Sequence, residues 1–292
     1  MREFVYVAPQ SIDEAIFELR RGHAWPLAGG TDLLPQLREG RRRADRIVDL
    51  KRIAGLAAIQ CLPDGGIEIG AALSATRVAR HQAIAASYPA IAASARLIGS
   101  VQVQNRASLG GNVCNAAPSA DAVPALICHE ARAHVASANG RRNMPLEDFI
   151  VGPGKTILQA GELLISISLA AVRRRSATTY LRFTPRREMD IAIAGVAVRL
   201  DLAEDRTIAL ARIVLAAVGP TPLRAASAEQ LLRGNRPERA LSTAAGRAAA
   251  NDARPISDTR ASADYRHALV EVLTRRGVDA CARALNLEGE MA

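Results

Sequence analysis

The 292-residue sequence has few aromatic residues and almost no lysine. Aromatic residues make up 3% of the chain, and Lys51 and Lys155 are its only lysines, so arginine carries nearly all of the cationic side chains behind the net charge of +9. Proteins that bind single-stranded nucleic acid stack bases on aromatic side chains, and nucleic-acid sites cluster their basic residues on one face. Here the arginines are scattered, apart from residues 41–43 and 173–175. We therefore expect no nucleic-acid binding and interpret the charge as suited to an acidic partner protein.

The sequence also lacks clustered cysteines. Its four cysteines contain no C-x-x-C pair: Cys61, Cys114, Cys128 and Cys281. An iron–sulfur cluster needs about four thiolates held close together, and a structural zinc site needs comparable spacing. We therefore expect no metal site in this chain, and no disulfide framework either, because we expect a reducing compartment.

Long apolar runs are absent as well. No run approaches the roughly 18 residues that are needed to span a bilayer, although 49% of the residues are hydrophobic and can build a sizeable core. The first ten residues, MREFVYVAPQ, carry charge but no apolar centre, which is unlike a secretion signal. The expectation is a cytoplasmic protein with no transmembrane segment.

The N-terminal part alternates strand-like and helix-like patterns, which favours α/β organisation. Ser11 and Glu14 form an S-x-x-E capping box that predicts a helix start between strands at 5–7 and 24–28. Apolar spacing predicts a helix from about Thr31, and residues 110–119 form a long irregular loop in this interpretation. The remaining predicted strands are 47–50, 67–69, 133–136 and 163–169, and the remaining helices are 76–86, 90–97 and 120–129.

A charged, unpatterned segment at residues 173–176 is the best candidate for a domain boundary. Three strand-like runs follow it, at 178–183, 194–202 and 208–217. Helices then fill the rest, notably 262–276 and 279–287. Strands followed by helices indicate a small α+β domain, so we predict one domain over residues 1–174 and another over residues 175–292.

A first glycine motif, P-L-A-G-G-T-D-L-L, occupies residues 26–34 between a predicted strand and a predicted helix. Gly29 and Gly30 allow positive φ and a close approach to a ligand, and the amides at a helix start favour an anion. The motif is not G-x-G-x-x-G, and taken alone a tight structural turn explains it at least as well.

A second glycine motif runs from Ser108 to Asp121, S-L-G-G-N-V-C-N-A-A-P-S-A-D. Its small residues have the makeup of a backbone cradle around a pyrophosphate. Asp121 could accept a hydrogen bond from a ribose hydroxyl or cap its own helix, and both alternatives stay open. Two such motifs about eighty residues apart predict that they hold the two ends of one diphosphate.

The motifs also carry a family resemblance. The segments A-G-G-T-D-L-L at 28–34, S-L-G-G-N at 108–112 and A-P-S-A-D at 117–121 occur in order with R-R-E-M-D-I-A at 186–192 and a closing helix over 257–276. In this combination the chain resembles the FAD-binding medium subunit of the molybdenum hydroxylases, the family of xanthine dehydrogenase and aerobic carbon monoxide dehydrogenase. The resemblance covers essentially the whole chain.

The resemblance implies an α+β fold and a set of cofactor contacts. The expected FAD-binding domain has two subdomains, about 1–57 and 58–174, of the vanillyl-alcohol-oxidase and cresol-methylhydroxylase type, followed by a C-terminal domain with a three-stranded sheet and helices. Since neither glycine motif contains histidine, we expect FAD to be bound non-covalently. The residues that the resemblance places on FAD are Leu27, Ala28, Gly29, Gly30, Thr31, Asp32, Leu33, Ile98, Ser108, Leu109, Gly110, Gly111, Asn112, Asp121, Leu164, Arg182 and Ile191.

The resemblance further implies an oxidoreductase subunit that passes electrons from iron–sulfur clusters on a partner, through FAD, to NAD, a quinone or another acceptor. The molybdenum cofactor and the [2Fe-2S] clusters are expected only on a large and a small partner subunit, in a dimer of heterotrimers. No residue here is expected to be catalytic or to bind metal. Met189 stands where some relatives have an acidic residue, which leaves the acceptor open. The alternative is a standalone FAD-dependent oxidoreductase of the same fold.

Overall fold

The computed structural model describes residues 3–187 and 189–286. Its contacts divide the chain into two compact units, each built from separate segments. The first unit comprises Met1–Val78, Ser100–Ala116 and Glu130–Ala171, and the second comprises Ala79–Gly99, Ala117–His129 and Val172–Ala292. The structure contains helices, a parallel sheet and antiparallel sheets, which confirms the predicted α+β class. The division at residues 174 and 175 stays a prediction, because the units interleave along the chain.

The first unit contains a small parallel sheet with the strand order β1-β3-β2. Its strands are β1 (Val5–Val7), β2 (Ala24–Leu27) and β3 (Arg46–Asp49). The connecting helix α1 (Ile12–Leu19) begins as the capping box predicts, since the Ser11 hydroxyl accepts the Glu14 amide at 3.2 Å. Helix α2 (Leu33–Arg38) joins β2 to β3. The predicted strand–helix–strand pattern of the first fifty residues is confirmed.

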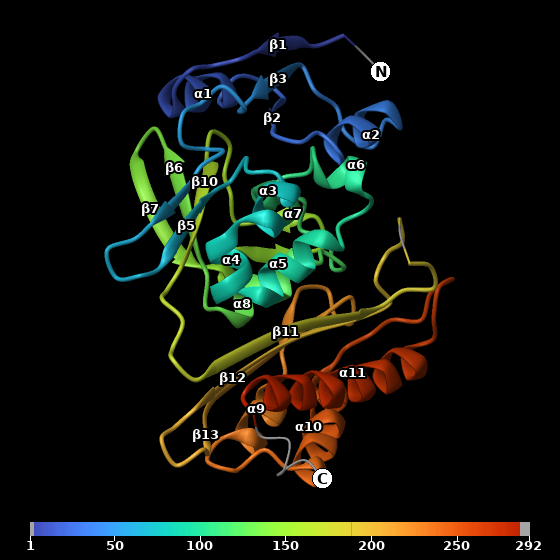
Figure 1. The fold of residues 1–292 in the computed structure, drawn as a ribbon. Coiled ribbons are helices and arrows are strands. Elements are labelled where there is room, and N and C mark those ends of the chain that lie inside the picture. The colour runs from blue at the N-terminus through green and yellow to red at the C-terminus, as the bar shows by residue number, and fades with distance from the viewer. Residues whose placement is uncertain (1–2, 188, 287–292) are drawn as a thin grey trace. The chain divides into compact units, whose positions relative to one another are not determined.

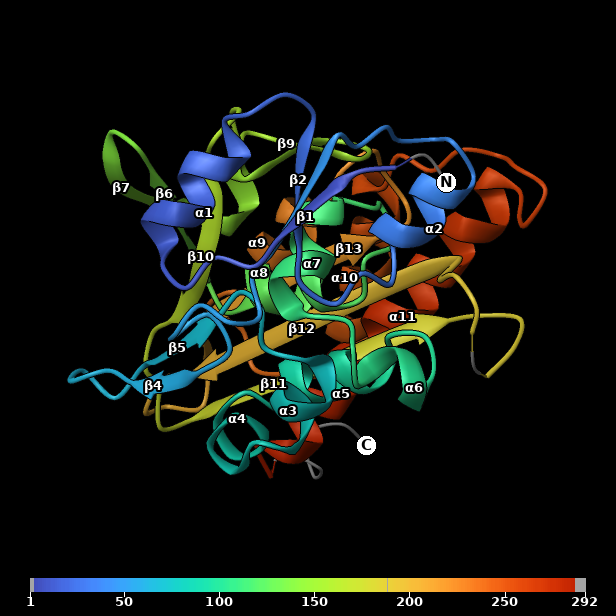
Figure 2. The same cartoon turned by 90° about the horizontal axis from the view of Figure 1, so that it is seen from above.

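A five-stranded antiparallel sheet completes the core of the first unit. Its order is β4-β5-β10-β6-β7, that is Ile59–Cys61, Ile67–Gly70, Leu163–Leu169, Arg132–Ser137 and Gly140–Pro145. Helix α1 lies beside β6 (Figures 1 and 2) and buries Ala15, Ile16 and Leu19 in one cluster with Leu163 and Ile165. A two-stranded ribbon, β8 (Ile150–Gly152) and β9 (Lys155–Thr156), and a 3-10 turn at Leu146–Asp148 precede β10.

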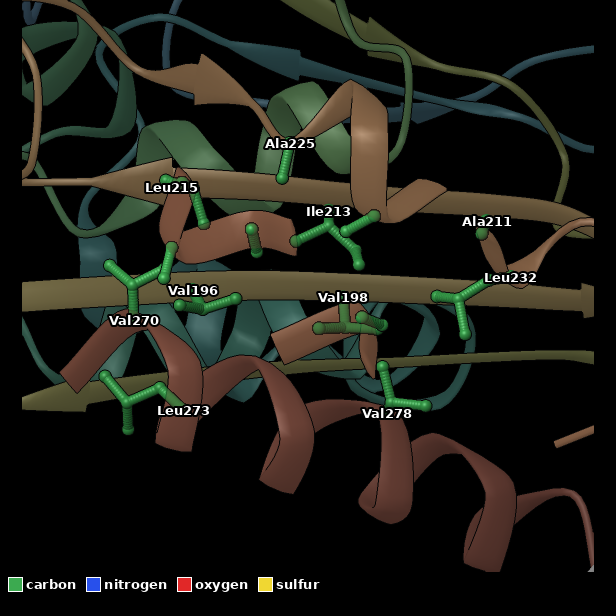
Figure 3. Packing of buried hydrophobic residues seen from close by; sticks show 14 of the residues in the cluster. Val196, Val198, Ala211, Ile213, Leu215, Ala225, Leu232, Val270, Leu273 and Val278 are labelled. Carbon is green, nitrogen blue, oxygen red and sulfur yellow. The ribbon is translucent and has the colours of Figure 1, made fainter. Parts of the chain in front are cut away.

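The second unit is an antiparallel sheet covered by helices on both faces. The strand order is β11-β12-β13-β14: Ser176–Phe183, Ala194–Leu202, Ile208–Ala216 and the two-residue Leu223–Arg224. One face packs against α9 (Ala226–Leu232), α10 (Arg239–Asp252) and α11 (Ala263–Ala284), where Val270 and Val278 lie over Val196 and Val198 of β12 (Figure 3). Helices α5 (Pro89–Arg96) and α8 (Ala122–Cys128) pack against the strands as well. Strand β12 is therefore buried over eight of its nine residues.

Two sequence-based predictions about helices are wrong. The expected loop at 110–119 begins as helix α7 (Leu109–Asn115), and the expected pair of helices at 262–276 and 279–287 is one helix, α11, over its described part. Both errors treat glycine as a helix breaker, at Gly110 and at Gly277. A Cβ added at Gly277 would lie 2.7 Å from Cγ2 of Val198, so this glycine lets α11 approach the sheet. The packing that this close approach permits outweighs the low helix propensity of glycine.

Several smaller elements were not anticipated from the sequence. These are β4, β7, the β8–β9 ribbon, α6 (Val101–Gln104) and the break between α3 (Ala75–Arg80) and α4 (Gln82–Ser87). In the described ranges, no helix has both the length and the apolar character that crossing a bilayer would require.

Replacing Gly246 of α10 with alanine should destabilise the protein, although alanine is the better helix former. A Cβ at this position would lie 2.6 Å from the backbone oxygen of Glu271 in α11, and a neighbouring helix backbone cannot move aside locally. We expect Gly246→Ala to lower the free energy of unfolding by about 1–3 kcal/mol, measured by urea denaturation. The exposed position Ala244 of the same helix is the control: Ala244→Gly should cost about 1 kcal/mol from propensity alone. Stabilisation of the protein by Gly246→Ala would contradict the close helix contact.

Candidate functional site

The two glycine motifs meet in the first unit. A Cβ added at Gly29 would lie 2.1 Å from the backbone oxygen of Arg106 and 2.7 Å from Cα of Ala107, which directly precede the second motif. Only glycine leaves room for this contact between two backbones. The motif helices are also joined by their side chains, because the amide of Gln36 in α2 donates to Asn115 of α7 at 3.2 Å. The two motifs are therefore in contact, and their joint hold on one diphosphate stays a prediction.

The first motif presents a run of unpaired backbone amides. No acceptor among the described residues takes a hydrogen bond from the amides of residues 29–32, which lead into α2. Gly30 has a φ of +76°, a left-handed conformation that glycine adopts at no steric cost. Four consecutive amides at a turn that leads into a helix form the kind of concave, electropositive backbone that binds phosphate.

A lysine also contacts the turn. The Lys51 ammonium donates to the backbone oxygen of Ala28 at 3.2 Å and pairs with the Asp49 carboxylate at 2.7 Å. Asp49 is buried and also accepts the Tyr6 hydroxyl and the Lys51 amide. These hydrogen bonds to Asp49 hold its pKa below the usual value even though burial alone would raise it. A positive charge is thus held next to the start of the first motif.

The second motif contains the start of helix α7, and the amides of its two glycines donate hydrogen bonds within the chain. The amide of Leu109 donates to the Leu73 oxygen at 3.1 Å, that of Gly110 to the Ala71 oxygen at 3.0 Å, and that of Gly111 to the Ser108 hydroxyl at 3.0 Å. Gly110 allows the helix to touch residue 71, since its Cβ would lie 2.6 Å from the Ala71 Cβ. These three hydrogen bonds hold the start of α7 against residues 71 and 73, and the contact of the second motif with a phosphate stays a prediction.

Asp121, Tyr180 and Arg182 form a buried polar cluster in the second unit. One carboxylate oxygen of Asp121 accepts the Tyr180 hydroxyl at 2.9 Å, and the other accepts Arg182 at 2.5 Å. Burial raises the pKa of Asp121, and the Arg182 charge and both hydrogen bonds oppose that shift. Gly195 of β12 makes room, because its Cβ would lie 2.6 Å from the Tyr180 hydroxyl. The alternative in which Asp121 caps α8 is wrong, since its side chain makes no capping hydrogen bond.

The remaining predicted site residues are separate from these clusters. Leu164 lies within β10 of the first unit and is 2% exposed, and β10 packs against α7. Ile98 follows α5 in the second unit and is 8% exposed. Ile191 is 44% exposed in the segment between β11 and β12, where its amide donates to Asp190. The contact of each with FAD stays a prediction.

Two residues of the clusters were not anticipated from the sequence. Tyr180 precedes Arg182 by two positions in β11, so strand alternation places both on one face. That signal was present in the run T-T-Y-L-R-F at 178–183. Lys51 gave no comparable signal, because its approach to Ala28 depends on the pairing of β2 with β3.

Family models match the chain in two parts. The first, described as the FAD binding domain in molybdopterin dehydrogenase, matches residues 2–170, and the second, the CO dehydrogenase flavoprotein C-terminal domain, matches residues 179–281. The fold and its site are thus those of a flavoprotein in this class. The chain belongs to the FAD-binding subunits of the molybdenum hydroxylases, the family of the xanthine and carbon monoxide dehydrogenases, and is an oxidoreductase subunit.

Known relatives are similar to this chain over nearly its whole length. The chain is 33% identical to the nicotine 6-hydroxylase medium subunit of Paenarthrobacter nicotinovorans, covering 94% of this chain and 95% of that one. It is 30% identical to the putative xanthine dehydrogenase FAD-binding subunit XdhB of Escherichia coli (strain K12), with 88% of each covered. A solved structure of carbon monoxide dehydrogenase from Hydrogenophaga pseudoflava matches with a TM-score of 0.92 at 31% identity, covering 97% of this chain and 98% of the other. The predicted fold, an FAD-binding domain followed by a C-terminal domain, is confirmed.

The residues of the first motif fit an FAD diphosphate. The unpaired amides of residues 29–32 offer donors for two phosphates, and the nearby Lys51 contributes positive charge. Gly29 and Gly30 keep the turn free of side chains. The neighbouring second motif supplies a rigid support rather than further free amides.

Replacing Gly29 with alanine should weaken FAD binding strongly. The new Cβ would collide with the Arg106 carbonyl and displace the turn that carries the free amides. We expect FAD affinity to fall at least tenfold, about 1.4 kcal/mol, as measured by flavin titration of the apoprotein. Gly152→Ala is the matched control, since its Cβ would meet nothing nearer than 4.0 Å and its φ is not positive. Equal FAD affinity of Gly29→Ala and Gly152→Ala would contradict this assignment.

Replacing Arg182 with glutamine should destabilise the protein in a pH-dependent way. The folded pKa of Asp121 is raised above its unfolded value, so the folded state holds this proton more tightly and its stability falls as pH rises through the raised pKa. Arg182→Gln removes the main opposing charge, raises that pKa further and leaves a buried carboxylate without its partner. We expect a loss of about 3–5 kcal/mol at neutral pH that shrinks towards pH 4, measured by denaturation across this range.

The double variant Asp121→Asn with Arg182→Gln is the control for this prediction. It removes both charges and should recover most of the stability at neutral pH. A loss in Arg182→Gln that does not change between pH 4 and pH 7 would mean that Asp121 is not the group responsible.

Proposed function

We propose that this chain is the electron-transferring FAD subunit of a multi-subunit molybdenum hydroxylase. In this role it receives electrons from iron–sulfur clusters on a partner subunit and passes them to NAD, a quinone or another acceptor. The observation that carries the proposal is the turn at residues 29–32, whose free amides are supported by the second motif. When bound, FAD supplies the one-electron and two-electron chemistry.

The protein's own work is to bind and orient that cofactor. The amides of residues 29–32 and the Lys51 charge would hold the diphosphate, and the packing of Gly29 on Arg106 and Ala107 would keep the turn from moving. A fixed position matters because electron transfer between cofactors depends on their separation. No side chain of this chain is assigned a role as acid or base.

The remaining predicted contacts belong to this proposal as well. Asp121 would face the adenosine part with a geometry set by Tyr180 and Arg182, which already occupy one lone pair on each carboxylate oxygen. Each oxygen has a second lone pair that can accept a ribose hydroxyl. Ile98 and Ile191 would lie near the ring, Leu164 near the adenine, and Ser108 and Asn112 beside the diphosphate.

The names of the relatives support partner subunits. The relative in Hydrogenophaga pseudoflava is the medium chain of carbon monoxide dehydrogenase, and another relative is subunit alpha of a 6-hydroxypseudooxynicotine dehydrogenase complex. By this likeness we propose one large partner with the molybdenum cofactor and one small partner with [2Fe-2S] clusters, assembled as a dimer of heterotrimers in the cytoplasm. The net charge of +9 favours association with acidic surfaces.

The isolated chain should contain FAD but oxidise neither aldehydes nor N-heterocycles. Acid or heat should release all of the flavin, because neither glycine motif contains a histidine for a covalent bond. Co-expression with the neighbouring genes should yield a complex in which substrate reduces the flavin, followed by its absorbance near 450 nm. The Gly29→Ala complex should keep its metal centres but lose electron transfer to the acceptor.

Three outcomes would contradict this proposal in whole or in part. Turnover by the isolated chain would favour the standalone oxidoreductase, which requires a substrate pocket of its own. Flavin that stays attached to the denatured chain would refute the non-covalent binding. A purified chain that takes up no FAD would overturn the proposal as a whole.

A further inference from the structure

A cavity of about 480 Å³ lies in the first unit, at the end of α2 opposite to the glycine turn. Its lining combines apolar and cationic side chains from two places in the chain, residue 4 and the segment 37–44: Phe4, Leu37, Arg38, Gly40, Arg42, Arg43 and Ala44. Residues 33–36 of α2 lie between the turn at residues 29–32 and Leu37, the first residue of this helix in the lining, which is about 6 Å of helix rise. The volume is within the range of about 300–1,000 Å³ that is usual for small-molecule sites.

Two of the lining arginines have no carboxylate within ion-pair distance among the described residues. Arg43 pairs with Asp45 at 3.5 Å, whereas no such contact is found for Arg38 or Arg42. The Arg42 guanidinium lies over the Trp25 ring, 4.2 Å from its centroid, which fixes the orientation of the side chain. Burial lowers the pKa of Arg42, and the charge of Asp32 in the first glycine motif opposes that shift. A partly desolvated cation of this kind is stabilised by an anion.

We propose that this cavity binds a small phosphate-bearing organic anion, with the phosphate on Arg38 and Arg42 and the apolar part against Phe4 and Leu37. Guanidinium groups are suited to phosphate, because their planar N–H donors match its oxygens. The apolar wall has no function for an inorganic anion, which is why an organic phosphate such as a nucleotide fits better. The electron-transfer role of the chain is not a premise of this site.

Trp25 provides a direct probe of the cavity. It is the only tryptophan in the sequence, and its indole N–H donates to the Arg43 oxygen at 2.8 Å beneath the Arg42 guanidinium. Protein labelled with ¹⁵N-tryptophan therefore shows one indole cross-peak. An anion that binds Arg42 must change the environment of this peak.

The test is a titration of the FAD-loaded protein with ADP, AMP, adenosine and inorganic phosphate, followed by the indole peak and by calorimetry. We expect ADP to bind saturably with a Kd below about 1 mM, with no flavin released. Adenosine should give no shift, and inorganic phosphate should bind at least tenfold more weakly than ADP. Arg38→Gln and Arg42→Gln should each weaken ADP binding at least tenfold by calorimetry, with unchanged FAD content.

Arg41→Gln is the matched control. Arg41 belongs to the same run of arginines, but it does not line the cavity and it pairs with Glu39 at 2.7 Å. It should bind ADP as the unmodified protein does. Equal weakening in Arg41→Gln, or no ADP binding at 10 mM (about 2.7 kcal/mol), would overturn the site. Release of FAD as ADP binds would show that ADP occupies the flavin site instead, and this too would overturn the proposal without affecting FAD binding by the turn at residues 29–32.

Discussion

The contact between Gly29 and the Arg106–Ala107 backbone is the constraint on which the site depends. It joins a turn near the start of the chain to a helix about eighty residues later, at a distance that no other amino acid allows. The turn is consequently held by this contact, while its amides at residues 29–32 have no acceptor among the described residues. A diphosphate bound by backbone amides requires such support, since a mobile turn would lose conformational entropy on binding. The Lys51 contact to Ala28 adds a second point of attachment.

The two glycine motifs resemble each other in sequence but differ in their physical roles. In the first motif, glycine creates a left-handed turn and leaves amides unpaired. In the second motif, the amides donate to the backbone oxygens of residues 71 and 73 and to the Ser108 hydroxyl. Gly110 has no side chain, which allows the helix to pack closely against Ala71. Glycine also provides a close contact at Gly246 and Gly277. At both positions, an atom of a neighbouring helix or strand would lie within 2.7 Å of an added Cβ. In each helix the packing gained exceeds the roughly 1 kcal/mol of propensity that glycine costs.

The second unit shows the same dependence on packing at a polar site. Strand β12 is covered by helices, and the paired side chains of Arg182 and Asp121 are themselves only 6% and 10% exposed. A buried carboxylate of this kind is stable only with a partner, which Arg182 and Tyr180 supply. Gly195 is necessary for that arrangement because a side chain there would displace the Tyr180 hydroxyl.

Local patterns in the sequence were sufficient for the strands and for the family. The capping box at Ser11 predicted the start of α1. The alternation in β10 and the strand-like runs of β1 and β12 also express short-range rules, so these three strands were predicted with their observed limits. The motifs at 28–34 and 108–121 were likewise enough to indicate FAD, because their order along the chain is specific to one family.

Only the tertiary structure decided how those motifs work. Whether a glycine breaks a helix or packs against a neighbour depends on what lies next to it, and neither Gly110 nor Gly277 carries that information locally. The side chain of Asp121 contacts Arg182, sixty-one positions away, instead of capping α8. The amides of Leu109 and Gly110 are paired by residues 73 and 71. The sequence determined which residues could form the site, and long-range contacts determined which of their atoms remain available to a ligand.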